Sequence, residues 1–319
     1  MREKQKNNVK EYILLSKVYN FQGVLLIDKP IDWSSNAVLQ KVKKILFVNK
    51  AGHTGSLDPL ATGMLPLCLG ETTKFVQYGI NEDKHYRVIA KFGEQTTTSD
   101  LHGMIKKIRS INFTDYELKM GLKSFQGKIK QIPSIFSAIK YKGTPLYKYA
   151  RHDIKIPILS REIFVYNIKY VNRVENFIEL EIKCSKGTYI RTIIDNLGEL
   201  LGCGAHVTYL RRLQVGSYPK CKMITLHDLL TLNKMNSISF QKTINNLLLP
   251  IDALIDFLPK IIISNVAVSC LKKGQKVFFS FIIKNILVRV IDVEQKFIGL
   301  GEIDKHGYLK PKRLLSIKN

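Results

Sequence analysis

A chain of 319 residues exceeds the size at which a single hydrophobic core usually stops growing, so we expect one large domain and one smaller domain. Its 50 Lys and Arg residues outnumber its 26 Asp and Glu residues, and the resulting net charge of +24 favours a polyanionic partner such as nucleic acid. An AT-rich genome would also raise the Lys content, so charge alone leaves that assignment open.

The cysteines and histidines argue against several classes of protein. The five cysteines form no Cys-x-x-Cys pair, which is unlike a disulfide framework or a zinc site. No His-Glu-x-x-His spacing occurs, and no apolar run approaches the roughly 18 residues of a membrane span. We therefore expect a cytoplasmic protein without a metal and without membrane contact, and a monomer as the simplest state.

The chain opens with a charged stretch that lacks the apolar core of a signal peptide, so residues 1–22 are predicted to be a flexible basic tail. Gly23 to Ile27 is predicted to be a short apolar strand. Ser34 or Ser35 then provides the cap of a helix, whose shared apolar face consists of Val38, Val42, Ile45 and Leu46.

The next segment, from Gly52 to Pro66, is punctuated by Gly and Pro and contains one acidic residue, Asp58. Pro59 disfavours helical geometry at the residue before it, and the glycines permit close backbone approaches. Such a loop can hold a carboxylate rigidly, which makes Asp58 a candidate for chemistry. Asp-Pro also begins ordinary turns, so the pattern alone leaves a structural role open.

Alternating apolar residues from Tyr86 to Phe92 predict a strand with one buried face, and Thr114 with Glu117 predicts a capping box at the start of a helix. The segment from Lys128 to Arg151 combines two prolines and several tyrosines with many basic or polar residues. That composition favours a mobile segment that folds against a partner. An extended connection packed on its own domain is the alternative.

Ile178 to Cys184 alternate as in an amphipathic strand, Ser185 to Gly187 form a turn, and the apolar spacing from Ile190 to Leu197 is helical. A Gly-rich stretch ends this helix before an extended, basic run from Val207 to Leu213. Strands and helices thus mix without a strict repeat, which indicates the α+β class.

A polar, Asn-rich passage from Leu232 to Asn246 interrupts the pattern. From Pro250 onward, short apolar runs separated by glycines predict a small β domain. Ile286 to Val293 and Lys296 to Ile303 are its predicted strands.

Several motifs resemble the tRNA pseudouridine-55 synthases, the TruB family of uridine-isomerising enzymes. The resemblance rests on GHTGSLDPLATGMLP at 52–66, GVLLIDKP at 23–30, KHYRV at 84–88, QIPS at 131–134 and CSKGTYIRT at 184–192. It implies a pseudouridine-synthase fold, with a large mixed, mainly antiparallel sheet flanked by helices over 23–248. It also implies an RNA-gripping insertion at about 128–151 and a small PUA-like RNA-binding domain at 249–319, where the match is weaker.

The same resemblance implies that the chain isomerises uridine to pseudouridine at position 55, in the T-arm loop of tRNA, after flipping the base out of the stack. The reaction would cleave the N-glycosidic bond, rotate the base and rejoin it through carbon, and it requires no cofactor. The family positions fall on Asp58 as catalytic carboxylate, Arg191 as its neighbouring cation, Tyr86 stacked on the base, Tyr189 and Leu210 in the substrate pocket, and His53 in the RNA loop. Whether Asp58 attacks the sugar or acts on it as a base stays open.

Other interpretations also stay open. Arg191 could contact an RNA phosphate, and Tyr86 could be a core residue. The whole chain could be a non-catalytic RNA-binding or tRNA-folding protein of the same fold. A metal-dependent nuclease or deaminase would need clustered carboxylates or a His and Cys set, and the sequence shows neither. Asp32 stands where the family usually has glycine, which puts the geometry of that turn in question.

Overall fold

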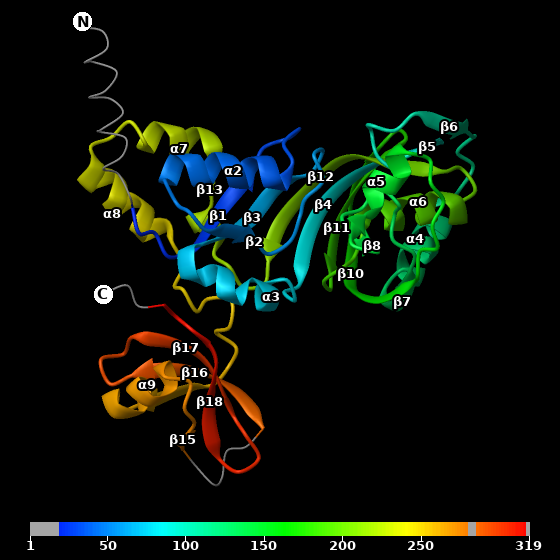
Figure 1. Cartoon of the computed structure of the whole chain (residues 1–319). Helices are drawn as coiled ribbons and strands as arrows, with labels where there is room; N and C mark the ends of the chain where they lie inside the picture. Colours follow the sequence, from blue (N-terminus) through cyan, green and yellow to red (C-terminus); the bar gives the residue numbers. More distant parts are fainter. Residues whose placement is uncertain (1–18, 280–284, 317–319) are drawn as a thin grey trace, which may run out of the picture.

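The computed structural model describes residues 19–279 and 285–316, and its largest element is a nine-stranded sheet (Figure 1). The strands are β1 (Gly23–Lys29), β2 (Ala51–His53), β3 (Thr62–Leu69), β4 (Lys84–Phe92), β7 (Gly127–Gln131), β10 (Arg161–Val174), β11 (Phe177–Cys184), β12 (Ala205–Val215) and β13 (Ile224–Thr225). They follow the order β13-β1-β3-β12-β4-β11-β10-β7, and β2 pairs with β3. The pairs β1–β13 and β3–β12 are parallel and the others are antiparallel. The expected mixed, mainly antiparallel sheet is therefore confirmed.

One end of the sheet packs against α4 (Asp115–Ser124) and α6 (Ile190–Leu200), as Figure 1 shows. Strand β4 alternates as predicted, with every second residue from Lys84 to Phe92 buried. The capping box at α4 is also confirmed, because the Thr114 side chain accepts the Glu117 backbone N–H and the Glu117 side chain accepts the Thr114 backbone N–H. Local periodicity and capping were sufficient to locate these elements.

The other end of the sheet is covered by α2 (Ser35–Leu46), α7 (Leu226–Leu232) and α8 (Ser237–Leu247). Ser34 is the N-cap of α2 and accepts the Ala37 backbone N–H, as the sequence predicted. Residues 1–18 of the expected tail lie outside the described residues. Phe21, near its end, is buried against the Phe240 ring, with 6.2 Å between ring centroids.

Helix α8 overlaps most of the Asn-rich passage 232–246, which interrupts the periodic pattern of the sequence. Asn236 caps the helix by accepting the Ser239 backbone N–H, and Phe240 and Ile244 share the face that packs on the sheet. This pair is spaced by one helical turn, but the polar residues around it dilute the periodic signal. The passage therefore contributes to the core, although its sequence pattern did not predict a helix.

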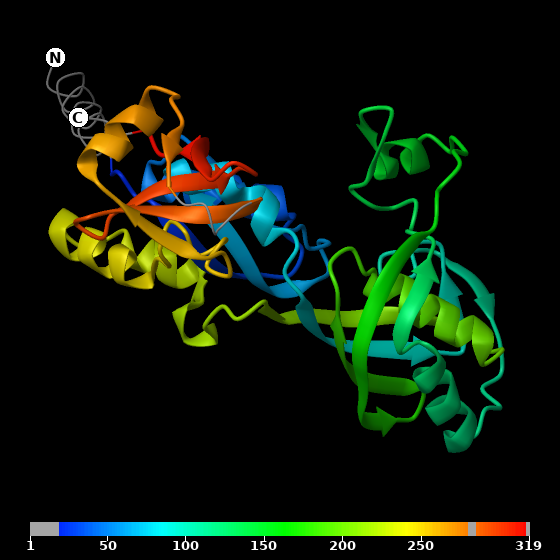
Figure 2. The ribbon, with the colours of Figure 1, turned by 90° about the horizontal axis from the view of Figure 1, so that it is seen from below.

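The segment between β7 and β10 projects from the body of the domain, as seen in Figure 2. It contains a small hairpin of β8 (Lys140–Tyr141) and β9 (Thr144–Pro145), followed by α5 (Leu146–Arg151). Leu146 is buried, and the rings of Tyr141 and Tyr149 meet edge to face with 6.0 Å between centroids. We call residues 132–160 the insertion; its hairpin and helix pack on each other through these residues.

The C-terminal part forms a separate five-stranded sheet in the order β14-β16-β17-β18-β15. Its elements are β14 (Lys260–Ile263), α9 (Asn265–Lys272), β15 (Val277–Phe278), β16 (Ile286–Asp292), β17 (Phe297–Ile303) and β18 (Tyr308–Leu314). The two strands predicted here match β16 and β17 to within one residue at each end. Leu300 of β17 packs in one apolar cluster with Val24 and Leu26 of β1, so the small sheet is joined to the large one.

Remaining short elements connect the two sheets or border the site. They are η1 (Gly70–Phe75), α3 (Val76–Gly79), the hairpin of β5 (Glu94–Thr96) and β6 (Ile105–Ile108), and η2 (Lys220–Lys222). No helix in the described part of the chain is long and apolar enough to span a membrane. Across residues 19–279 and 285–316, no group of three His, Cys, Asp or Glu side chains is placed to hold a metal ion.

Candidate active site

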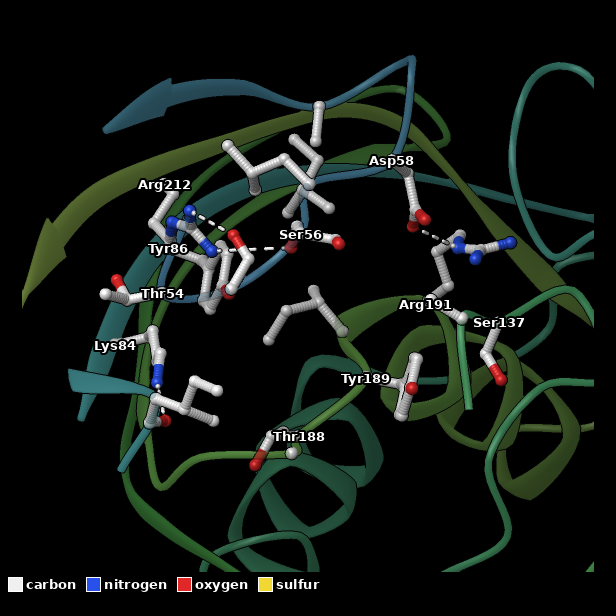
Figure 3. A pocket seen from close by; sticks show the side chains of 18 of the residues that line it. Thr54, Ser56, Asp58, Lys84, Tyr86, Ser137, Thr188, Tyr189, Arg191 and Arg212 are labelled. Carbon is white, nitrogen blue, oxygen red and sulfur yellow. Dashed lines mark hydrogen bonds and ion pairs between the residues drawn. The ribbon is translucent and has the colours of Figure 1, made fainter. Parts of the chain in front are cut away.

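A cavity of about 450 Å³ opens beside the middle strands of the large sheet (Figure 3). Its walls come from the loop after β2, from β4 and β12, from the turn before α6 and from the insertion. The predicted site residues His53, Asp58, Tyr86, Tyr189, Arg191 and Leu210 all line it. The structure therefore brings together residues that are far apart in the sequence.

Asp58 and Arg191 point toward one another on one side of the cavity, as Figure 3 shows. Arg191 Nε lies 2.8 Å from Asp58 Oδ2. The Arg191 side chain is 5 % exposed, whereas that of Asp58 is 38 % exposed and faces the cavity. The Asp58 carboxylate is therefore accessible to a molecule bound in the cavity, whereas the Arg191 guanidinium is buried in the wall.

Arg191 is held in place by three further acceptors. Its Nη1 donates to the Thr98 carbonyl at 2.9 Å and lies 3.2 Å from Asp100 Oδ2. Its Nη2 donates to the Phe136 carbonyl of the insertion at 3.0 Å. Because a guanidinium offers donors in a fixed plane, these contacts hold the group in place, with Nε forming an ion pair with Asp58. Sequence reasoning missed Asp100, which no motif pointed to.

Burial and charge act on the Asp58 carboxyl in opposite directions. Burial raises its pKa and the nearby Asp100 carboxylate adds to the rise, while Arg191 and Lys29 favour the ionised form. The net result is a pKa above the ordinary value for aspartate, because removing a carboxylate from water is costly. A carboxylate that is poorly solvated and held by one strong partner is suited to react with an electron-deficient sugar carbon.

Lys29 is fully buried and supports the loop that carries Asp58. Lys29 Nζ donates to the carbonyls of Pro30, Trp33 and Pro59, at 2.8, 2.5 and 3.1 Å. Burial lowers the pKa of Lys29 to about 8, and Asp58 opposes the shift. Lys29 lies within the motif at 23–30, but the sequence did not predict its role as a support for the loop.

Arg212 of β12 fixes the other end of the same loop and was also missed. Its Nε donates to the Met64 carbonyl at 2.7 Å and its Nη2 to the Gly55 carbonyl at 3.1 Å. The close approach of β3 to β12 requires glycine at 63, where φ is 100° and a Cβ would lie 2.2 Å from the Arg212 carbonyl oxygen. The loop therefore has little freedom between β2 and β3.

Tyr86 and Leu210 form a buried apolar wall of the cavity, from the adjacent strands β4 and β12. Burial raises the pKa of Tyr86, and the nearby Arg212 opposes that rise. Tyr189 lies at the start of α6 beside Ser137 (Figure 3), and burial raises its pKa as well. Aromatic faces of this kind suit a planar base.

His53 borders the cavity at the end of β2, and its Nδ1 is buried without a hydrogen-bond partner among the described residues. Burial and the nearby Arg212 lower the pKa of His53, so its ring is neutral at pH 7. Lys84 lines the same cavity; burial lowers its pKa to about 8, and its Nζ donates to the Ile80 carbonyl at 2.8 Å.

Asp32 occupies the turn between β1 and α2 with a φ of 63°, in the left-handed region that favours glycine. Its N–H donates to the Pro59 carbonyl at 2.8 Å, and its carboxylate lies 3.7 Å from His102 Nε2. The turn questioned in the sequence analysis thus keeps a geometry suited to glycine, and its backbone supports the Asp58 loop.

We expect Asp32→Gly to raise the free energy of unfolding by up to about 1 kcal/mol, because glycine adopts a positive φ without strain. Asp32→Ala should lower it by about 1 kcal/mol, since a methyl group gains nothing from the local polar contacts that aspartate can make. Urea denaturation of the parent and of the two variants measures their free energies of unfolding, which should fall in the order Asp32→Gly, parent, Asp32→Ala. An alanine variant as stable as the parent would contradict it.

Comparisons with known proteins show which family the chain resembles. Residues 43–190 match the TruB family pseudouridylate synthase N-terminal domain, 191–256 match the tRNA pseudouridylate synthase B C-terminal domain, and 259–315 match the C-terminal domain of pseudouridine synthase II TruB. The tRNA pseudouridine synthase B of Pectobacterium atrosepticum is 51 % identical over 298 residues, which cover 92 % of this chain and 95 % of that protein. The protein of the same name from Buchnera aphidicola is 52 % identical over 305 residues, covering 94 % and 98 %.

Among solved structures, a crystal structure of a Cbf5–Nop10–Gar1 complex superimposes with a TM-score of 0.67 and 26 % identity, covering 93 % of this chain and 84 % of that one. The fold and these matches define the protein as a pseudouridine synthase, which is an isomerase. Within that class, the chain belongs to the TruB family, because the family domains account for residues 43–256 and 259–315.

Proposed function

We propose that this protein converts uridine to pseudouridine at position 55, in the T-arm loop of tRNA, with Asp58 as the catalytic carboxylate. The observation that carries the proposal is the Asp58 carboxylate, held 2.8 Å from a buried guanidinium and facing a cavity of about 450 Å³. Small-molecule sites commonly fall between about 300 and 1,000 Å³, so a single nucleoside fits this volume. The names of the 51 % and 52 % identical relatives support tRNA as the substrate.

The reaction breaks the bond between N1 and the anomeric carbon, turns the base, and forms a bond from C5 to the same carbon. The proton lost from C5 is balanced by one gained at N1, so no redox partner or cofactor is needed. Asp58 can either attack the electron-deficient sugar or remove a proton from it, as in glycoside chemistry. In both routes Arg191 keeps the carboxylate ionised and aimed.

The other predicted residues would hold the base while it turns. Tyr86 would stack on the uracil, and Leu210 and Tyr189 would close the pocket and exclude water. His53, at the rim and neutral, would stack into the RNA loop from which the uridine has been extruded. Unstacking costs a few kcal/mol, and contacts to phosphates offset that cost.

The proposal extends to the partners and to the division of the chain. A net charge of +24 favours binding to the T-arm stem-loop, with the region at about 128–151 gripping the RNA. Residues 23–248 would form the catalytic domain and 249–319 a PUA-like RNA-binding domain, in a monomeric, cytoplasmic protein. The described cysteines are all free, which fits a reducing compartment.

The test is product formation on a synthetic T-arm hairpin and on full-length tRNA transcripts, mapped by chemical labelling of pseudouridine. We expect one modified uridine, at position 55, in both RNAs. A matched hairpin with cytidine at that position is the control and should yield no product. A protein that binds the hairpin without forming product would instead support a non-catalytic RNA-binding role.

Activity should depend on pH through Asp58. Because burial raises the pKa of this carboxyl above the ordinary value for aspartate, protonation should remove the reactive carboxylate at a higher pH than for a free aspartate. The single-turnover rate on the hairpin is therefore expected to fall on the acidic side, at a pH above the range in which a free aspartate titrates. Hairpin binding and circular dichroism over the same range provide the control. A rate that stays constant down to pH 4 would contradict the assignment.

A further inference from the structure

Gln131, the last residue of β7, connects the start of the insertion to the start of α6. Its side chain is buried, with 3 % exposure for the residue. Gln131 Nε2 donates to the Tyr189 carbonyl at 3.0 Å, and the Tyr189 N–H donates to Gln131 Oε1 at 2.9 Å. One amide side chain therefore binds both polar groups of a single backbone residue in another element.

Tyr189 is the N-cap of α6, and its own side chain makes no capping bond. Its carbonyl also accepts the Ile193 N–H at 3.2 Å, which is the first hydrogen bond of the helix. Gln131 thus binds the residue whose conformation decides where α6 begins. In a capping box the equivalent bond to the N-cap N–H comes from the same helix, whereas here it comes from a neighbouring strand.

The polar groups that the start of α6 supplies to the cavity lie within two residues of this contact. The Tyr189 ring lines the cavity, and Arg191 carries the guanidinium that meets Asp58. The insertion itself contacts the same helix start, because the Phe136 carbonyl accepts a hydrogen bond from Arg191 Nη2 at 3.0 Å. The start of α6 is therefore bonded both to the chain at the beginning of the insertion and, through Arg191, to Asp58.

We propose that Gln131 is a positioning residue that fixes Tyr189 and Arg191 relative to Asp58 and links that alignment to the seating of the insertion. The inference rests on the proposed function, since it concerns the same carboxylate. Gln131 should therefore affect the rate of the chemical step, whereas the affinity for RNA should depend on other surfaces.

Gln131→Met keeps the length and the burial of the side chain but removes both hydrogen bonds. We expect it to lower the single-turnover rate on the T-arm hairpin by about 10- to 100-fold, because misplacement by about 1 Å can cost that much. The dissociation constant for the hairpin should stay within about threefold. Amide hydrogen exchange at Tyr189 should become faster, as its N–H loses its acceptor.

Gln131→Glu separates positioning from general damage to the fold. A protonated carboxyl has one donor and one acceptor and can reproduce both bonds to Tyr189, whereas an ionised carboxylate only accepts and faces the Tyr189 carbonyl. The ratio of its rate to the parent rate should therefore be near one at low pH and fall to the level of Gln131→Met or below as pH rises. Burial places this transition above the usual range for glutamate, so rates between about pH 5 and 8 will show it.

Gln95→Met is the matched control, because Gln95 Nε2 contacts the same helix farther along, at Asp195 Oδ1 at 3.1 Å. It should leave the rate unchanged.

The inference is overturned if Gln131→Met keeps the parent rate, if it loses only affinity, or if the pH profile of Gln131→Glu runs parallel to that of the parent. Asp58→Asn, tested alongside, distinguishes the two ideas: an active Asp58→Asn protein refutes the proposed function, whereas an inactive one with full-rate Gln131→Met refutes only this inference.

Discussion

Replacing Asp58 with asparagine is expected to lower the single-turnover rate on the T-arm hairpin by at least about 1,000-fold. The amide keeps the size of the carboxylate but can neither attack a sugar carbon nor accept its proton. Binding should stay within about threefold, because affinity comes mainly from phosphate contacts. Rates from labelled pseudouridine and binding by filter retention measure the two effects separately.

The fold should survive this change. Arg191 keeps Asp100, the Thr98 carbonyl and the Phe136 carbonyl as partners. Asp28→Asn is the matched control: Asp28 of β1 pairs at 2.6 Å with Arg211 of β12, across the intervening strand β3, and neither residue lines the cavity. It should keep activity within about threefold. An Asp58→Asn protein with near-parental rate would refute the assignment of the carboxylate.

Arg191→Lys should have the second largest effect, with a rate about 100- to 1,000-fold lower and a free energy of unfolding about 2–4 kcal/mol lower. A lysine keeps the charge but has one donor centre in place of three nitrogens, so it cannot reach Asp58, Asp100 and the Phe136 carbonyl together. The groups it leaves are buried or half-buried, which is why stability also falls. Single-turnover kinetics and urea denaturation measure both quantities.

Arg87→Lys is the control for this substitution. Arg87 also contacts two carboxylates, Glu179 and Glu181, but on the solvated face of the sheet with its side chain 43 % exposed. Exposed ion pairs contribute about 1 kcal/mol or less, so this variant should lose little stability and no activity. Equal losses of rate and stability in the two variants would contradict the prediction that the buried contacts of Arg191 cause its larger effect.

Elements with a strong local pattern were predictable from the sequence. The alternation in β4 and the capping residues Ser34 and Thr114 depend on neighbours a few positions away, so the sequence shows them directly. Helix α8 was not predicted, because its buried face consists mainly of Phe240 and Ile244 within a polar segment. Its stability comes from packing on the sheet, and a short window does not contain that information.

The residues of the site also fall into those that could be predicted from the sequence and those that could not. The residue pattern pointed to Asp58, and the family resemblance pointed to Arg191, Tyr86, Tyr189, Leu210 and His53; all six line one cavity. Lys29, Arg212 and Gln131 were missed as supports because most of their partners are backbone carbonyls. Every residue has a carbonyl, so the sequence does not mark which of them a distant side chain will bind.

By itself, the sequence determined the family resemblance, the basic charge and the carboxylate held between Gly and Pro residues, since these are properties of residues and of their near neighbours. Only the tertiary structure decided that Arg191 would meet Asp58 at 2.8 Å, that Asp100 would stand behind it, and that Gln131 would hold the start of α6. Those contacts join strands and helices distant in the chain, and their geometry is fixed by the register of the sheet and the packing of α6 upon it.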